Sequence, residues 1–364
     1  MPRRQLDITK DLFIAFRDDN REAFLQHADE YVRYLNWKKY GKKALEFEEI
    51  VTQIRQKVQH KDWAEPFGDK NIELTLFGDE IIKKQYPKPV KSPNVWQISR
   101  GAVVDFMPAS VLLEYCIDSK RKHFSNSEFP AVIGYAPEKS EGFTRILYFL
   151  GLLDDKTKAP SSLARLIMQN DKYFEEIGTL WFLHYFISSD SRLIIWNRIA
   201  NHLFAKQSFN YEDTVRLLED QKQFHALTAF SQHLRKEFNT CIKAYKDSNF
   251  SKLNIFSSNE SSSNYDKAQP YHVSDEILLA AIWLFKKRYF PSEVTLEIKT
   301  LANAENSPGR LFYLSERYFR DALDRLRVKG YIAIESLADL DQIKFIQFKD
   351  YLDVLNIYYN QKLS

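Results

Sequence analysis

Ser307-Pro308-Gly309-Arg310-Leu311-Phe312 is the stretch of sequence that decides the expected fold, together with residues 315–330 that follow it. Pro308 and Gly309 suit the central positions of a type II turn, because proline fixes φ and glycine accepts a positive φ. Ser315 can cap a helix by accepting a hydrogen bond from an exposed backbone N–H, and Gly330 can take the left-handed conformation that ends it. The sequence therefore predicts a turn followed by a capped helix.

The predicted helix has an apolar face and a charged face. Phe319, Leu323 and Leu326 recur at helical spacing and form the stripe expected to be buried. After the helix, residues 331–334 and 343–346 have the pattern of two strands, joined through a polar segment. A capped helix followed by such a hairpin predicts a winged-helix-like unit.

The charged face of this helix favours a nucleic-acid contact. We predict that Arg317, Arg320 and Arg327, together with Arg310 from the preceding turn, form one basic surface that binds the phosphates of double-stranded DNA. Asp324 lies on the same face, so an ordinary solvated charged helix is an alternative of equal standing.

The composition sets the class of protein. The chain has 364 residues, enough for two or three domains, and its aromatic content of 15% contrasts with only 10 Gly and 12 Pro. These values predict a mainly α, multi-domain protein with few short strands. The net charge of +3 requires any contact with nucleic acid to come from local patches. Cys116 and Cys241 are far apart in sequence and have no Cys-x-x-Cys partner, which argues against disulfides and thiolate zinc sites.

Breaks in the pattern divide the chain. We predict an N-terminal helical domain over residues 1–95, a central helical domain over 96–255, a flexible linker over 256–270 and a C-terminal winged-helix-like domain over 271–364. The linker is inferred from a polar, serine-rich run with almost no apolar residues. No apolar region follows the N-terminus and no apolar run approaches 18 residues, so we expect a cytoplasmic protein with no membrane partner.

The central domain contains a second helix-turn-helix candidate over residues 127–153. Lys139 and Arg145 in its second helix are candidates to contact DNA phosphates. Glu138 and Glu141 lie at the end of that helix that would enter the major groove, and they would repel the DNA backbone. Simple core packing of this helix is therefore the favoured alternative.

A catalytic centre is not evident in the sequence. Hydrolysis of a phosphodiester needs a metal held by carboxylates or histidines, or a nucleophile with its base, and no compact motif of either kind stands out. His184 is the best single catalytic candidate, because it lies between Trp181 and Tyr185 with Glu175 and Glu176 upstream. A lone histidine in an aromatic helix is more often a core residue, and that alternative is preferred. Phosphate loops and dinucleotide fingerprints are absent, which argues against the use of ATP or NAD.

Several separate motifs carry a family resemblance. Residues 178–185, Gly-Thr-Leu-Trp-Phe-Leu-His-Tyr, are followed by Trp196, by Asn201-His202 and by the stretch from Ser307 to Phe312. The order and spacing of these motifs resemble the bacterial domain-of-unknown-function 4007 family over roughly two thirds of the chain.

The resemblance implies a component of a DNA phosphorothioation system, in which sulfur replaces a non-bridging phosphate oxygen and which also serves in defence against phage. It implies a DNA-nicking factor that works beside a cysteine desulfurase and an ATPase. If the chain nicks DNA, we expect Mg²⁺ or Mn²⁺ as cofactor, because such a metal stabilises the charge that develops on the phosphate. No metal ligand can be named. The alternatives are a catalytically inert adaptor of the same system and a winged-helix transcription factor.

The chain departs from the family pattern in two places. No Gly-His-Glu-Thr-Phe motif is present near residues 104–110, and Pro137-Glu138-Lys139-Ser140 replaces the usual Gly-Lys-Asn. If those residues carry the family's chemistry, this member binds without cutting.

Overall fold

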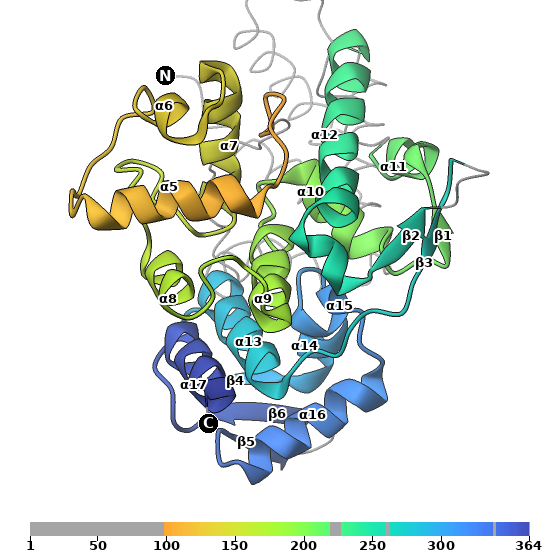
Figure 1. The fold of residues 1–364 in the computed structure, drawn as a ribbon. Coiled ribbons are helices and arrows are strands. Elements are labelled where there is room, and N and C mark those ends of the chain that lie inside the picture. Colours follow the sequence, from red (N-terminus) through yellow and green to blue (C-terminus); the bar gives the residue numbers. More distant parts are fainter. Residues whose placement is uncertain (1–97, 219–226, 259–262, 338–339, 364) are drawn as a thin grey trace, which may run out of the picture. The chain divides into compact units, whose positions relative to one another are not determined.

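The computed structural model describes residues 98–218, 227–258, 263–337 and 340–363. The chain separates into two compact units, residues 1–88 and 89–364. All described residues belong to the second unit, which is drawn in colour in Figure 1. The predicted N-terminal domain, residues 1–95, lies outside the described residues.

The second unit is mainly helical, as predicted. Its helices are α5 (Phe106–Asp118), α6 (Phe129–Ile133), α7 (Pro137–Phe149), α8 (Ser162–Asn170), α9 (Ile177–Ser188), α10 (Ile194–His202), α11 (Tyr211–Leu217), α12 (Leu227–Asp247), the 3₁₀ helix η2 (Asn249–Leu253), α13 (Asp275–Tyr289), α14 (Ile298–Asn303), α15 (Pro308–Leu311), α16 (Glu316–Val328) and α17 (Tyr351–Leu363). Its strands are β1 (Ser208–Phe209), β2 (Phe256–Ser258), β3 (Tyr265–Lys267), β4 (Thr295–Glu297), β5 (Ile332–Leu337) and β6 (Leu340–Phe345).

Helix α9 lies at the centre of the core. Its sequence is apolar on every face, and ten of its twelve residues are buried. It packs against α13, α10, α15 and η2. A helix that is hydrophobic all round must be enclosed on all sides, and these neighbours provide that enclosure. Leu180 and Trp181 are fully buried.

Helix α16 begins and ends where local signals predicted. The Ser315 side chain accepts a hydrogen bond from the Tyr318 N–H, and Gly330 adopts φ = +74° just beyond the last turn. Phe319, Leu323 and Leu326 are buried. The predicted apolar stripe is therefore confirmed.

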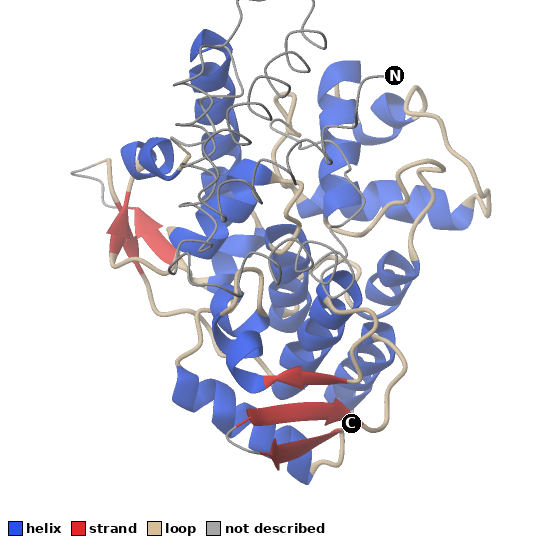
Figure 2. Ribbon diagram, turned by 180° about the vertical axis from the view of Figure 1, so that it is seen from behind, coloured by secondary structure: helices blue, strands red, loops and turns tan. Residues whose placement is uncertain are grey.

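The strands form two small antiparallel sheets, which Figure 2 shows at separate edges of the unit. One sheet has the order β4-β6-β5, with Ile334 opposite Ile343, so the predicted hairpin after α16 is confirmed. The other has the order β1-β3-β2. Strands β2 and β3 occupy parts of the predicted flexible linker over 256–270, and those parts are ordered because β3 pairs with both β2 and β1. The division into domains at 96–255 and 271–364 stays a prediction.

The predicted turn at Pro308 and Gly309 is wrong. Pro308 instead stands at the first position of the short helix α15, where its missing N–H is not needed. A Cβ on Gly309 would lie 2.6 Å from the carbonyl oxygen of Ala302 in α14. The glycine is therefore required by the close approach of two helices and not by a left-handed turn.

Helix α17 connects distant parts of the chain. It packs against α13 and α8, as Figure 1 shows. The Tyr358 hydroxyl accepts a hydrogen bond from the Gly178 N–H at 3.2 Å, and the hydroxyls of Thr179 and Tyr359 are 2.7 Å apart. The first turn of α9 is thus completed by side chains about 180 residues later in the chain.

Candidate functional site

The outer face of α16 carries three of the four arginines predicted to contact DNA. The Arg317 side chain is 93% exposed and lies 4.0 Å from the Asp321 carboxylate. Arg327 lies 3.3 Å from Asp324, and Arg320 donates to Asp341 of β6 at 2.6 Å. Each arginine therefore has a carboxylate partner, in surface ion pairs that are generally worth little.

The opposite side of α16 is anchored by ion pairs to α13. Arg325 donates two hydrogen bonds from Nε and one from Nη2 to the Asp275 carboxylate, and Lys329 donates to Glu276 at 2.7 Å. The two carboxylates stand in the first turn of α13, where negative charge is favoured by the helix dipole. These contacts hold α16 in place, so its outer face is a fixed surface.

A shallow hollow of about 400 Å³ adjoins this face, between α14, α16 and β6. Its charged lining residues are Glu297, Lys299, Glu316, Arg320 and Asp341. Carboxylates outnumber cations there, so the hollow itself is a poor place for a phosphate.

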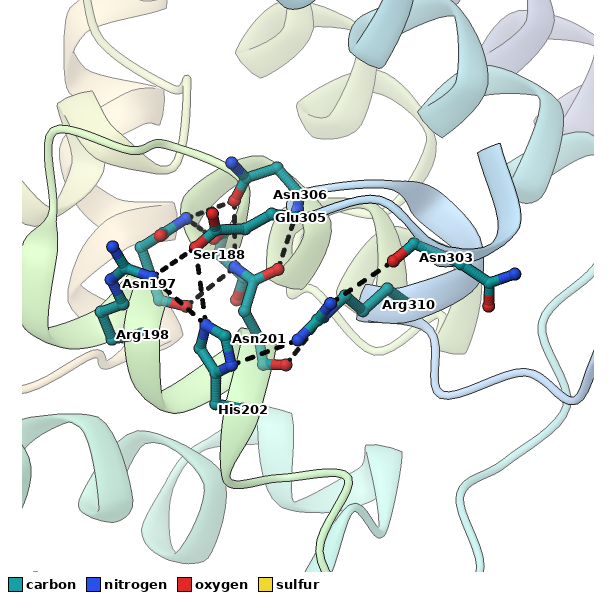
Figure 3. A network of polar contacts seen from close by, with 9 residues as sticks. All are labelled: Ser188, Asn197, Arg198, Asn201, His202, Asn303, Glu305, Asn306 and Arg310. Atoms are coloured by element: carbon teal, nitrogen blue, oxygen red, sulfur yellow. Dashed lines mark hydrogen bonds and ion pairs between the residues drawn. The ribbon is translucent and has the colours of Figure 1, made fainter. Parts of the chain in front are cut away.

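Arg310, the fourth predicted arginine, belongs to a different set of contacts, shown in Figure 3. Its Nε donates to the carbonyl oxygen of Asn201 at 2.9 Å, and its Nη2 is 3.2 Å from Nδ1 of His202. Its Nη1 reaches the Asn303 carbonyl oxygen at 3.4 Å. The guanidinium thus binds carbonyl groups at the C-terminal ends of α10 and α14, where positive charge is favoured. Its contact with DNA stays a prediction.

Three buried asparagines form the base of the network in Figure 3, and we call them the asparagine cluster: Asn197, Asn201 and Asn306. The Asn306 N–H donates to Asn201 Oδ1 at 2.8 Å, while Asn201 Nδ2 donates to Asn306 Oδ1 at 2.9 Å. Asn197 Nδ2 also donates to Asn306 Oδ1. Asn306 has φ = +67°, a left-handed conformation that asparagine tolerates better than most residues. The cluster fixes the loop between α14 and α15 against α10.

The exposed edge of the same network is the polar rim, made of Arg198, His202, Glu305 and Arg310. Arg198 donates to Glu305 at 2.8 Å, and His202 Nε2 lies 3.5 Å from the same carboxylate oxygen. An arginine flanks each ring nitrogen of His202: Arg310 Nη2 lies 3.2 Å from Nδ1, and Arg198 Nη1 lies 3.4 Å from Nε2. The hydrogen bond from His202, followed by the charge of Arg198, lowers the pKa of the Glu305 carboxyl.

The spacing of residues on α10 explains how this helix contributes to both the asparagine cluster and the polar rim. Asn197 and Asn201 are four residues apart, as are Arg198 and His202, so each pair lies on one face of the helix. The sequence prediction named Asn201 and His202 but missed Asn197, Arg198, Glu305 and Asn306. The two polar pairs Asn197-Arg198 and Asn201-His202 are four residues apart, and this spacing could have indicated a polar face on α10. No local pattern pointed to Glu305 and Asn306 in the loop.

His184 is fully buried in α9. Its Nε2 lies 2.9 Å from the Leu311 carbonyl oxygen and must donate to it, so Nδ1 accepts from the Tyr245 hydroxyl at 2.5 Å. Burial lowers the pKa of the imidazole to about 4, which keeps it neutral near pH 7. Both nitrogens bind protein groups, and this geometry supports the structural role over the catalytic one.

Lys139 and Arg145 lie on α7 as predicted. The Lys139 ammonium is 3.8 Å from the centre of the Tyr135 ring, a cation–π contact. Arg145 is half-buried, and its charge acts on Glu237 of α12. Glu141 on the same helix forms an ion pair with Arg100. A role of this helix in DNA binding stays a prediction.

The described residues contain no group of three or more His, Cys, Asp or Glu side chains placed to hold a metal ion. Cys116 and Cys241 are both buried free thiols. Within the described part of the chain, no helix has the length and apolar character needed to span a membrane.

Comparisons with known proteins give a family and two similar folds. The family model described as "Protein of unknown function (DUF4007)" matches residues 148–359. A magnesium ion-bound crystal structure of SspB matches with a TM-score of 0.55 and 16% sequence identity, over 73% of this chain and 91% of that one. A second SspB crystal structure gives a TM-score of 0.53 with the same identity and coverage. No curated protein matches the sequence.

Proposed function

Since the chain belongs to the DUF4007 family, whose model matches residues 148–359, we propose that it is a DNA-binding component of a DNA phosphorothioation system. The observation that carries the proposal is the outer face of α16, which presents Arg317, Arg320 and Arg327 beside the sheet β4-β6-β5. The likeness of the fold to SspB supports the same assignment.

The order of elements from α13 to β6 supports a winged helix. A helix, a strand, two short helices, a longer helix and a hairpin follow one another, and the first strand pairs with the last. In helix-turn-helix proteins, the recognition helix enters the major groove and its flanks contact phosphates. We assign α16 to that role and the β5–β6 hairpin to the wing.

Ion pairs on α16 need not prevent this role. Surface pairs contribute about 0–1 kcal/mol each, whereas a phosphate can accept two charge-assisted hydrogen bonds from one guanidinium. Arg317 and Arg327 pair with residues of their own helix, so they can exchange Asp321 and Asp324 for phosphates without any change in the fold.

A binding titration at several salt concentrations tests the proposal. We compare the wild-type chain with Arg317→Ala/Arg320→Ala/Arg327→Ala on two unrelated duplexes, using fluorescence anisotropy. The variant should bind both duplexes more weakly, and the log–log salt slope should flatten by about one unit for each phosphate that the variant no longer neutralises. The control Lys122→Ala/Lys156→Ala/Lys206→Ala removes equal charge elsewhere. If both variants behave alike, or if the slope is unchanged, α16 is not the interface.

A catalytically inert adaptor is the second candidate. It is favoured by the mixed charge of α16, where every arginine of the outer face has a carboxylate partner. On this hypothesis the chain holds other proteins of the system, such as the cysteine desulfurase and the ATPase, without binding DNA itself. Association with those proteins in the absence of any duplex binding would favour the adaptor.

Nicking is a further proposal that rests on the family alone. If the chain nicks DNA, Mg²⁺ or Mn²⁺ would stabilise the charge that develops on the phosphate. The described residues do not offer a group of three or more His, Cys, Asp or Glu side chains that could hold this metal.

A further inference from the structure

A second hollow, remote in sequence from α16, lies between the loop at residues 99–103 and helix α12. Its volume is about 680 Å³, and it is lined by Ser99, Arg100, Gly101, Ala102, Val103, Glu138, Lys236, Asn239, Thr240 and Lys243. Figure 1 shows this loop, in orange, between α7 and α12. Apart from Glu138, which lies in the segment that replaces the family's usual Gly-Lys-Asn, these residues belong neither to the family motifs nor to the proposed interface.

The loop is held in place by a buried carboxylate. Glu237 of α12 is 4% exposed, and its Oε1 accepts hydrogen bonds from the N–H of Ile98, the N–H of Ser99 and the Ser99 hydroxyl. On the other side, Gly142 of α7 approaches so closely that a Cβ there would lie 2.0 Å from the Ser99 carbonyl oxygen. The hollow therefore has a rigid wall.

The loop turns sharply at its tip. Arg100 has φ = +41° and Gly101 has φ = +83°, and the Ala102 N–H donates back to the Ser99 carbonyl oxygen at 2.6 Å. The amides of Arg100 and Gly101 have no acceptor within the described part of the chain. They are available to donate to a ligand, as backbone amides do in anion-binding loops.

Helix α12 supplies the charge. Lys236, Asn239 and Lys243 are spaced by three and four residues, so they lie on one face of the helix. All three side chains are exposed, and neither lysine forms an ion pair with a described residue. Together with Arg100, the two lysines place three cations around the hollow. Glu138 is the one carboxylate among the described residues that line the hollow. Glu141 forms an ion pair with Arg100 but does not belong to the lining.

We propose that this hollow binds a phosphate group, with Lys236, Lys243 and Arg100 as its cationic ligands. Unpaired ammonium groups, an amide side chain and free backbone N–H groups suit the several acceptor oxygens of a phosphate. The volume accommodates a nucleotide-sized ligand. The same chemistry could come from a free nucleotide or from the backbone of a single DNA strand. The inference does not depend on the proposed role of α16.

Isothermal titration with three probes tests the inference: inorganic pyrophosphate, thymidine 5′-monophosphate and a short single-stranded oligothymidylate. The variant is Lys236→Gln/Lys243→Gln, and the matched control is Lys246→Gln, an exposed lysine of α12 outside the lining. The double variant should bind at least one probe on the order of tenfold more weakly or worse than wild type, while the control should match wild type.

The pattern of weakened binding identifies the source of the phosphate. Weaker binding of all three probes indicates a site for a free phosphorylated ligand, and an effect confined to the oligomer indicates a strand backbone. Equal affinities of wild type and double variant for every probe, or no binding of any probe by wild type, would overturn the inference. Arg317→Ala/Arg320→Ala/Arg327→Ala should leave pyrophosphate binding unchanged, so failure of the α16 proposal is measured separately.

Discussion

Trp181 is the residue on which the core around α9 most depends. Its ring is fully buried and meets the Phe312 ring edge-on, with centroids 5.4 Å apart. Trp181→Ala should lower the free energy of unfolding by about 3–5 kcal/mol, because it removes these contacts and leaves a cavity. The indole N–H has no acceptor among the described residues, so Trp181→Phe should cost less, about 1–2 kcal/mol. Urea denaturation of the two variants measures both values, and equal costs would contradict this account.

His184 should make stability depend on pH. The folded pKa of about 4 lies below the ordinary value of 6.5, so the unfolded chain takes up the proton first as the pH falls. Stability from the neutral imidazole is complete above pH 6.5 and declines toward pH 4, by on the order of 3 kcal/mol in all. The measurement is the difference in urea midpoint between pH 7 and pH 5. His184→Gln should flatten this difference, whereas the same change at the exposed His123 should leave it as in wild type. An unchanged difference in His184→Gln would show that the histidine is not buried in its neutral form.

At the scale of single elements, two glycines distinguish two kinds of constraint. Gly309 has backbone angles that any residue can adopt, but there is no space for a side chain, because an added Cβ would clash with Ala302. Gly330 has space but adopts φ = +74°. Gly309→Ala should destabilise by about 1–3 kcal/mol through displacement of α14 from α15, although alanine is the better helix former. Gly330→Ala should cost about 1–2 kcal/mol through backbone strain alone.

Asparagine separates the two cases in a thermal denaturation experiment. Gly330→Asn should recover much of the stability, because asparagine tolerates the left-handed conformation. Gly309→Asn should be at least as unstable as Gly309→Ala, since the larger side chain meets the same carbonyl. Recovery at both positions, or stabilisation by Gly309→Ala, would show that the approach of α14 and α15 is not limiting.

These elements also show what the sequence could predict. The ends of α16 followed from Ser315 and Gly330, because capping is decided by neighbouring residues. The hairpin after α16 followed from alternating apolar residues for the same reason. The role of Gly309 did not follow, because its cause is Ala302 in another helix. The intramolecular partners of Arg310 did not follow from the sequence either, because they lie at the C-terminal ends of α10 and α14.

The candidate sites were less predictable than the fold. Burial of His184 was the preferred expectation from its aromatic neighbours, but its partners Tyr245 and Leu311 are far away in sequence. The phosphate-binding hollow depends on Glu237, which holds a loop 138 residues earlier in the chain. Such sites are formed by segments that are distant in sequence, so no local sequence pattern predicts them.

At the scale of the whole molecule, we expect any nicking by this chain to require a divalent metal and to be weak without partner proteins. Cleavage of a phosphodiester develops charge that Mg²⁺ or Mn²⁺ would stabilise. Relaxation of a supercoiled plasmid, measured with added Mg²⁺ and with EDTA, checks this expectation. Strong relaxation by the purified chain in EDTA would contradict it. Complete inactivity with retained duplex binding would instead support a binding role.

The contacts between α17 and α9 impose an order on biosynthesis. Thr179 and Tyr359 are 180 residues apart, and a ribosome adding about 5–20 residues per second needs on the order of ten to forty seconds to cover that distance. During this interval α9 has been synthesised, but α17, whose tyrosines bind the first turn of α9, has not. The first turn of α9 therefore lacks its two tyrosine hydroxyl partners until residues 351–363 have been translated, although α10, η2, α13 and α15 are synthesised earlier.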